Sequence, residues 1–484
     1  MKFTPFKQSA LLVLTSMAMG CASSVPEVSS DFERSWQANH LEADAYLIPT
    51  APEALARRIA MVREAQHSID MTYFSGDKDT VGLMLLNEIK LAADRGVRVR
   101  LTLDDLLVFD EKWLAEVAQH EYIDIRVFNP FSSRNMGWMG RAFDFAVQKQ
   151  KRDHRLHEKY FNVDQQTMIL GGRNIGNAYF GYSREGNFFD MDVLFRGDVI
   201  EAFADNYQKM WDSEFVTPIE EVIKAKPANN YPLFYQALST AKQDREVVNA
   251  IVDSVEKLVN AKFTSVMTTP VFDSIAKLQD NKPYFRRRLE HTLQTPLERA
   301  EHVIISTPYP IAIQGQFRVI DQLIAQGTSV SLVTNSSSSN DSGFVPAYYE
   351  SYREQLLDSG VKIYEYKDRA LNDDHHFHAQ TYYHNKTVIV DTIQTYIGSS
   401  NFDPRSDFLN IEFGVVVESS QFAQQVHDYI LSQKQRLFWQ VERDDSNQTQ
   451  WSSEESRVSS SPNYGEEKAI PNWLFRQMSI ELEL

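Results

Sequence analysis

Apolar side chains in the first third of the chain follow a helical period in some segments and form strand-like runs in others. Residues 50–66 have the period of an amphipathic helix, and Thr50 and Glu53 form a capping box at its start. The next three segments are predicted as a strand, a helix and a strand, over residues 67–74, 80–96 and 97–105. Strands that alternate with helices in this way predict parallel strands covered by helices.

The second half of the chain repeats this order. A strand, a helix and a strand are predicted over residues 302–310, 316–327 and 328–335. Matching strands then follow a further helix in each half, over residues 121–130 and 359–368. We therefore predict an α/β fold of two duplicated domains, each a mixed β-sheet flanked by helices, related by a pseudo-two-fold axis.

The expected boundaries follow from this repeat and from local composition. The stretch between the repeats is predicted to be helical, and the polar, Ser-rich tail is predicted to be a loop or disordered. The resulting segments are a signal peptide (1–20), a tether (21–48), a first domain (49–219), a helical connection (220–284), a second domain (285–440), and a polar tail with a C-terminal segment (441–484).

The N-terminus has the pattern of an export signal. Lys2 and Lys7 precede an apolar stretch, residues 10–20, that is too short to span a bilayer as a mature helix. Cys21, the chain's only cysteine, follows directly, and the arrangement resembles the lipobox of bacterial lipoproteins, with Ala18 where leucine is usual. The resemblance implies acylation of Cys21 and attachment to a membrane surface through lipid. An ordinary buried or unpaired cysteine is the alternative.

Composition limits the class of partner. The 484-residue chain has a formal net charge of -17, and an acidic protein repels the phosphate backbone of nucleic acids. Hydrophobic residues make up 43% of the chain, which is enough for a soluble core. Beyond the N-terminal stretch, no run reaches the roughly 18 apolar residues of a membrane span.

Two stretches 227 residues apart contain the same polar residues at the same offsets. Each has a histidine, a lysine two residues later, an aspartate seven residues after the histidine, and an asparagine ten residues after the aspartate. These residues are His157, Lys159, Asp164 and Asn174 in the first stretch, and His384, Lys386, Asp391 and Asn401 in the second.

The repeated pattern predicts chemistry on a phosphodiester, in a site between the two domains. On a strand, a histidine and a lysine two residues apart share one face, whereas Asp164 and Asp391 lie at an odd offset and are assigned a structural role. The lysines supply positive charge, one neutral histidine attacks phosphorus, and the other protonates the leaving alkoxide. This chemistry needs no metal or other cofactor. The alternative is two ordinary strands with surface histidines and lysines.

The doubled H-x-K-x4-D and G-x-x-N pattern resembles the phospholipase D superfamily over about residues 51–437. Within it, "AADRGVRVRLTLDD" and "GGRNIGNAYF" resemble the cardiolipin synthase C branch of bacterial enzymes. The resemblance implies a duplicated phospholipase D fold, with His157 as the nucleophile and His384 as the acid. It also implies that a later carboxylate in each half orients its histidine. This carboxylate is Glu412 in the second half and Asp190 in the first, with Asp192 as the less favoured choice.

Two interpretations remain open for each of three further segments. His375, His376 and His378 are consistent with a metal site or, more simply, with a polar loop that enters the active site. The aromatic segment 129–145 is predicted to be an irregular loop that either meets lipid or packs on its own core. The segment 470–484 either enters a membrane or caps the fold, and we favour the cap because its glutamates suit anionic headgroups poorly.

The resemblance predicts a phosphatidyl transferase that joins phosphatidylglycerol to a second glycerophospholipid, such as phosphatidylethanolamine, through a phosphohistidine. The products would include cardiolipin. The alternatives are a hydrolytic phospholipase D, a nuclease disfavoured by the net charge, and an inactive lipid-binding lipoprotein. The expected location is the bacterial cell envelope, lipid-anchored and facing the periplasm. Ala22 after Cys21 resembles lipoproteins sorted to the outer membrane, whereas cardiolipin synthesis is expected at the inner membrane, so the choice of membrane is open.

Overall fold

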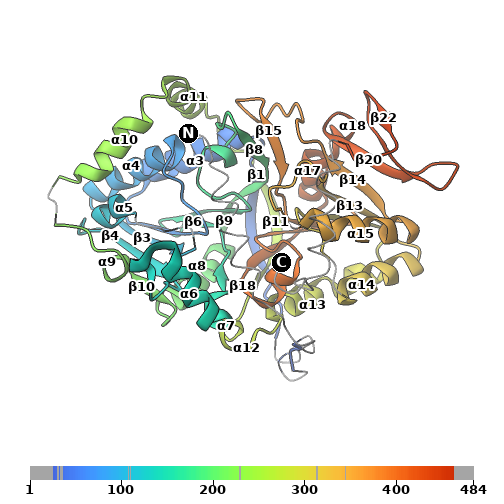
Figure 1. Cartoon of the computed structure of the whole chain (residues 1–484), viewed down its shortest axis with the longest axis horizontal. Coiled ribbons are helices and arrows are strands. Elements are labelled where there is room, and N and C mark those ends of the chain that lie inside the picture. Colours follow the sequence, from blue (N-terminus) through green and yellow to red (C-terminus); the bar gives the residue numbers. More distant parts are fainter. Residues whose placement is uncertain are drawn as a thin grey trace.

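The computed structural model describes residues 26–29, 32, 36–106, 108, 111–227, 230–311, 314–343 and 345–462 (Figure 1). The proposed signal peptide, Cys21 and the segment 470–484 lie outside these residues. Among the helices of the described part of the chain, none has the length and apolar character needed to cross a bilayer.

The first half of the chain forms a mixed sheet flanked by helices. Its strands are β1 (Leu41–Leu47), β2 (Ser68–Tyr73), β3 (Arg98–Asp104), β4 (Ile123–Phe128), β6 (Tyr160–Val163), β7 (Thr167–Gly171), β9 (Asp192–Gly197) and β10 (Val216–Pro218). They pair in the order β10–β4–β3–β2–β6–β7–β9–β1, with β2, β3 and β4 parallel and the other neighbours antiparallel. Its helices are α3 (Ala51–Glu64), α4 (Thr80–Asp94), α5 (Lys112–Val117), α6 (Gly137–Val147), α7 (Lys149–Arg152) and α8 (Val199–Trp211), with 3-10 turns η1 (Arg134–Met136) and η2 (Asn177–Tyr179).

The second half repeats this sheet, as the duplication in the sequence predicts. Its strands are β11 (Thr264–Phe272), β12 (His302–Ser306), β13 (Ser329–Asn335), β14 (Lys362–Tyr366), β16 (Thr387–Val390), β17 (Gln394–Gly398), β19 (Phe413–Glu418) and β20 (Phe438–Arg443). They pair in the corresponding order β20–β14–β13–β12–β16–β17–β19–β11, with β12, β13 and β14 parallel and the other neighbours antiparallel. Its helices are α12 (Lys277–Asp280), α13 (Tyr284–Glu298), α14 (Gln314–Ala325), α15 (Val345–Asp358), α16 (Pro404–Phe408), α17 (Ser420–Leu431) and α18 (Lys434–Leu437).

The two sheets join through the antiparallel pair β1 and β11 at the centre of the molecule, where Leu41 faces Thr268 (Figure 1). Strand β11 lies in the stretch that was expected to be a helical connection. That stretch does contain α9 (Ile219–Val222), α10 (Pro232–Ala241) and α11 (Arg245–Glu256), but its last part completes the sheet. Two short parallel pairs also join the halves, β5 (Arg155–Leu156) with β18 (Asn410–Ile411) and β15 (Gln380–Tyr383) with β8 (Gly186–Phe189).

Local sequence signals explain where several elements begin and end. The Thr50 side chain caps α3 by accepting the N–H of Glu53 at 3.2 Å, as the capping box predicts. Asp79 caps α4 through the N–H of Gly82 at 3.0 Å. The chain leaves α4 through Gly96, whose φ of 94° is a left-handed conformation that glycine adopts without strain.

The polar tail contains strands, and its prediction as a loop is wrong for residues 449–458. Strands β21 (Thr449–Ser452) and β22 (Arg457–Val458) extend the sheet beyond β20. Trp451 is buried, and its Nε1 donates to Glu365 at 2.8 Å. A single tryptophan in a Ser-rich stretch gives little periodic signal, so the hydrophobic pattern missed this hairpin.

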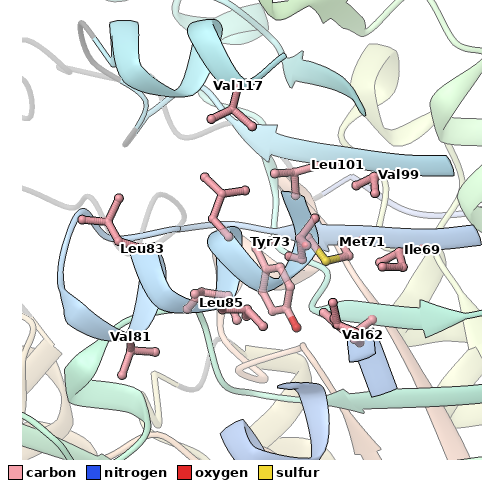
Figure 2. Packing of buried hydrophobic residues seen from close by; sticks show 14 of the residues in the cluster. Val62, Ile69, Met71, Tyr73, Val81, Leu83, Leu85, Val99, Leu101 and Val117 are labelled. Carbon is pink, nitrogen blue, oxygen red and sulfur yellow. The ribbon is translucent and has the colours of Figure 1, made fainter. Parts of the chain in front are cut away.

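Helices α3 and α4 cover the sheet of the first half through a continuous apolar core (Figure 2). Val62 of α3 and Leu85 of α4 are buried against Ile69 and Met71 of β2 and Val99 of β3. Burial of side chains of this size contributes about 1.5–3 kcal/mol each, which holds the strands in the register that the site needs.

Candidate active site

Two strand pairs that cross between the halves position the histidine motifs. The N–H of His157 donates to the carbonyl of Ile411 at 3.0 Å, which extends the pairing of β5 with β18. The N–H of His384 donates to the carbonyl of Phe189 at 2.8 Å, which extends the pairing of β15 with β8. Ile411 directly precedes Glu412, and Phe189 directly precedes Asp190. Each histidine is therefore held close to a buried carboxylate of the opposite half.

Each histidine contacts a carboxylate of the other half. Nδ1 of His157 lies 3.0 Å from both Oε1 and Oε2 of Glu412, and Nδ1 of His384 lies 2.7 Å from Oδ2 of Asp190. The expected pairing of each histidine with the carboxylate of its own half is therefore wrong. The reason is the exchange of short strands, which places each carboxylate across the interface from the motif of its own half.

Asp192, the less favoured choice in the sequence, contacts neither histidine. It begins β9 and accepts a hydrogen bond from Nη1 of Arg58 in α3 at 2.8 Å, with both side chains buried. This ion pair attaches the helix to the sheet, and it leaves Asp190 as the partner of His384.

The histidine and lysine of each motif lie between strands, and their prediction as one continuous strand is wrong. Strand β5 ends one residue before His157, and β6 begins one residue after Lys159. The same break separates β15 from β16 around His384 and Lys386. At this break the backbone stops pairing with a short strand of the opposite half and starts pairing with a strand of its own sheet. Nζ of Lys159 and Nζ of Lys386 each donate to the carbonyl of their own motif's histidine.

The two motif aspartates lie in turns away from the histidines, which supports the structural role assigned to them. Asp164 accepts the backbone N–H groups of His67 and Ser68 at 2.7 Å, and so binds the β6–β7 turn to the start of β2. Asp391 accepts the N–H of His302 at 2.7 Å and does the same for β12. Both aspartates have a positive φ, a conformation that Asp adopts more readily than most residues.

The two asparagines each present an unpartnered polar atom. Oδ1 of Asn174 and Oδ1 of Asn401 are buried and make no hydrogen bond among the described residues. Nδ2 of Asn174 donates to the hydroxyl of Tyr179 at 3.1 Å. Because the two ends of an amide can exchange, either asparagine can turn an N–H donor to an anionic ligand. Buried polar atoms without partners at equivalent positions indicate a place for such a ligand.

Burial and charge keep both histidines neutral. Burial lowers the pKa of His157 to about 4, although Glu412 opposes this shift. Burial would raise the pKa of Glu412, but the charges of His157 and Lys159 hold it at about 2. The pKa of His384 is lowered well below its ordinary value by burial and by the nearby lysines. An ionised Glu412 accepts the Nδ1 proton of His157, so the Nε2 lone pair is free to act as a nucleophile.

The lysines also titrate below their ordinary range. Burial lowers the pKa of Lys386 to about 8, with Asp190 and Asp341 opposing, and it lowers the pKa of Lys159 well below its ordinary value. The nearby carboxylates therefore do not fully offset the cost of burying the two ammonium groups. A bound anion would stabilise the charged form of both lysines.

Glu412 is held by residues that sequence reasoning missed. The hydroxyls of Ser399 and Ser406 donate to its two carboxylate oxygens. Lys277, buried in α12, pairs with Asp273 and donates at 2.9 Å to the carbonyl of Ser406. The sequence contains no signal for this cluster, because Lys277 and Ser406 are 129 residues apart.

Aromatic rings surround the histidines, and they too were missed. Phe74 packs against His157 with ring centroids 5.7 Å apart. Tyr179, Phe188 and Tyr309 pack against His384 at 5.8, 5.5 and 6.4 Å. Such rings lower the local polarity, which strengthens interactions between charges inside the site.

The histidine-rich loop lies near the site. Nε2 of His375 contacts the carbonyl of Phe188 at 3.2 Å, and His376 packs on Tyr182. Within the described part of the chain, no three His, Cys, Asp or Glu side chains converge as a group that could hold a metal.

The arrangement provides a neutral nucleophile, a second imidazole as proton carrier, two lysines and two amides. These groups fit a substitution at an anionic centre in which one bond is exchanged through a covalent intermediate. The family model described as "Cardiolipin synthase, PLD-like domain" matches residues 59–211 and 293–433 of this chain.

Curated proteins and a solved structure resemble the chain over most of its length. Cardiolipin synthase C of Escherichia coli (strain K12) is 32% identical over 422 residues, which cover 82% of this chain and 86% of that protein. Cardiolipin synthase A of Buchnera aphidicola is 22% identical over 415 residues, covering 82% of this chain and 71% of that protein. The crystal structure of phosphatidylserine synthase from Haemophilus influenzae Rd KW20 has a TM-score of 0.61 at 15% identity, covers 99% of both chains and shares the fold.

Proposed function

Because this chain belongs to the cardiolipin synthase, PLD-like domain family of the phospholipase D superfamily, we propose that it is a phosphatidyl transferase. It would join phosphatidylglycerol to the phosphatidyl group of a second glycerophospholipid and form cardiolipin. The crossed contacts of His157 with Glu412 and of His384 with Asp190 are the observation that carries this proposal. They supply one nucleophile and one proton carrier on opposite sides of a pseudo-two-fold axis.

In the first step, Nε2 of His157 attacks the phosphorus of the donor lipid. A phosphorus–nitrogen bond forms, the bond to the headgroup oxygen breaks, and His384 gives its proton to the leaving alkoxide. Lys159 and Lys386 neutralise the non-bridging oxygens. The phosphate charge also raises the pKa of His384 above its value in the empty site, which provides the proton that this step requires.

In the second step, the hydroxyl of phosphatidylglycerol gives its proton to His384, and its oxygen attacks phosphorus. The phosphorus–nitrogen bond breaks, and His157 returns to its neutral form. Glu412 stabilises the imidazolium character of His157 while the phosphate is attached. Water in place of the lipid alcohol would give hydrolysis, so the aromatic rings around the two histidines favour transfer by excluding water.

Product analysis tests the proposed reaction. Purified protein with mixed vesicles of phosphatidylethanolamine and phosphatidylglycerol is expected to form cardiolipin and ethanolamine, and the His157→Ala variant neither. Lipid mass spectrometry measures both products. Phosphatidic acid without cardiolipin would identify a hydrolase instead, and no change in any lipid would favour an inactive lipid-binding protein.

A carboxylate that is bound to Tyr309 and acts on Lys386 supports a donor with an ammonium headgroup. The hydroxyl of Tyr309 donates to Oδ1 of Asp341 at 2.8 Å, and the ring of Tyr309 faces His384. Asp341 is exposed, so a ligand can reach it. Its charge acts on Lys386, whose pKa burial lowers and Asp341 raises. An exposed carboxylate that is hydrogen-bonded to a tyrosine suits a small organic cation.

Asp341→Asn is expected to raise KM for phosphatidylethanolamine as donor about tenfold, because one charge contact to the ammonium group is lost. Transfer between two phosphatidylglycerol molecules should change less than about twofold. Steady-state kinetics with each donor measure the difference. Asp445→Asn, an exposed aspartate in the β20–β21 turn, is the matched control. Equal losses with both donors would contradict a role in headgroup selection.

We also propose that Cys21 is acylated and that the protein faces the periplasm of a bacterial cell envelope. A lipid-anchored body has direct access to glycerophospholipids in the membrane to which it is attached. This location fits the proposed substrates.

A further inference from the structure

We propose that helix α6, together with Met136, forms a surface that rests in the headgroup region of an anionic phospholipid bilayer. This apolar face consists of Met136, Met139, Phe143 and Val147, whose side chains are 63%, 57%, 61% and 63% exposed. The spacing of four residues places Met139, Phe143 and Val147 on one side of α6, and Met136 lies directly before the helix, at the end of η1. The inference rests on the proposed function, because it names the surface from which lipid substrates reach the site.

The segment was expected to be an irregular loop, and the structure instead contains η1 and α6. The opposite side of the helix is fixed to the protein. Nη2 of Arg141 donates to the carbonyl of Val108 at 2.6 Å, and Asp144 accepts the hydroxyl of Ser133 at 2.8 Å. Gly140 lies so close to the backbone of Ser133 that a Cβ there would clash. The apolar face is therefore not the side by which α6 packs on its own core.

Charge favours an anionic surface as the occupant. Residues 131–152 contain five basic residues and one acidic residue, although the whole chain has a net charge of -17. Arg134 and Arg141 pair with Asp105 and Arg152 is buried, so the two lysines supply the positive charge at the surface. The acidic residue, Asp144, is buried, whereas Lys151 is exposed and Lys149 is half-buried. An apolar helical face with lysines at one end is the pattern of an interfacial helix. A second copy on the same face would bring two basic margins together, which disfavours a symmetric dimer.

The apolar face is close to the proposed site along the chain. Val147 is ten residues before His157, and α7 and β5 occupy the residues between them. The backbone N–H of Leu156 donates to Asp104 at 2.9 Å, and Arg152 donates to the hydroxyl of Ser132 at 2.7 Å. These contacts bind the connection rigidly to the first half. Insertion of α6 would therefore place the motif at a fixed height above the lipid phosphates.

Site-specific quenching tests this orientation. The full chain with Cys21→Ser and an N-terminal hexahistidine tag is tethered to phosphatidylglycerol–phosphatidylethanolamine vesicles that contain nickel-chelating lipid. A single fluorophore is attached at Met139→Cys, at Phe143→Cys or, as a control, at Val259→Cys, where the native side chain is 71% exposed. Spin-labelled lipids are expected to quench the probes at 139 and 143 at least threefold more than the probe at 259, because interfacial helices sink about 5–10 Å.

Two results would overturn the proposal. Equal quenching at the three positions would show that α6 stays in solution while the protein is on the membrane. A change in the probe at 143 that depends on protein concentration without vesicles would show that another copy covers the face. This readout does not require turnover, so it remains valid if the proposed reaction fails.

The double variant Met139→Glu and Phe143→Glu adds a second measurement. Turnover of vesicle lipids should fall about tenfold or more, while turnover of a monodisperse short-chain lipid should stay within about twofold. Loss of both activities would place these residues in the folding core or the reaction itself and would contradict the proposal.

Discussion

The His157→Asn variant is expected to lose about 10⁴-fold or more of the phosphatidyl transfer rate, which corresponds to roughly 5.5 kcal/mol of transition-state stabilisation. Asparagine has no basic nitrogen at the position of Nε2, so the phosphorus–nitrogen bond cannot form. Mass spectrometry of the intact protein after lipid exposure should therefore find no phosphatidyl adduct. Asn174, Asn401 and both lysines remain in place, so the variant is expected to keep binding phospholipid.

The His384→Asn variant is expected to behave differently, because it keeps the nucleophile and loses the proton carrier. With a phosphodiester whose leaving group is p-nitrophenolate, which needs little protonation, the first step should proceed and release colour once per protein. Without a base, the acceptor hydroxyl would attack slowly, and the adduct on His157 should accumulate.

Peptide mapping shows which histidine is the nucleophile and which is the proton carrier. An adduct on residue 384 in the His157→Asn protein would reverse the roles of the histidines. Adducts on neither residue, together with a full rate of transfer, would mean that the reaction does not proceed through phosphohistidine.

The Glu412→Gln variant is expected to transfer about 10³-fold more slowly with little loss of lipid binding. Its amide keeps the size of the carboxyl group but removes the charge that stabilises the His157 imidazolium as the phosphorus–nitrogen bond forms. Ser399 and Ser406 contact different carboxylate oxygens, so in the variant one hydroxyl can donate to the amide oxygen and the other can accept from the amide N–H, which should preserve the position of the side chain. Steady-state kinetics should accordingly show a fall in kcat and a nearly constant KM.

A histidine titration separates this electrostatic role from a structural one. Glu412 opposes the lowering of the His157 pKa by burial, so its removal should move that pKa further below about 4. Opening of the site to water would instead move it up towards 6.5. NMR of selectively labelled imidazoles, with His157→Asn used to assign the signal, measures the direction.

Glu158→Gln is the matched control for this experiment. Glu158 lies next to His157 in the chain and is buried, and burial raises its pKa to about 8. It is therefore largely uncharged at neutral pH and contacts Asn206 at 3.0 Å. Its replacement should leave kcat within a few-fold of the parent. A loss as large as that of Glu412→Gln would mean that any buried change nearby disrupts the site.

Much of the fold could be predicted from the sequence, because the patterns that indicate its helices and strands are local. The capping box at Thr50, the helical period up to Gly96 and the alternation of strands and helices all depend on neighbouring residues, and they predicted α3, β2, α4 and β3. The duplication was equally visible, because the same residues recur 227 positions apart. Strand β11 and the β21–β22 hairpin were missed, since their stability comes from sheet neighbours far along the chain.

The sequence by itself determined the histidines and lysines of the candidate site, because two histidine–lysine motifs with the same offsets make a coincidence improbable. Only the tertiary structure decided how they pair. His157 and Glu412 are 255 residues apart, and His384 and Asp190 are 194 apart. No local period encodes a contact over such distances, and the exchange of short strands between the halves produces it. For the same reason, only the folded chain could tell that the apolar side of α6 faces away from the core.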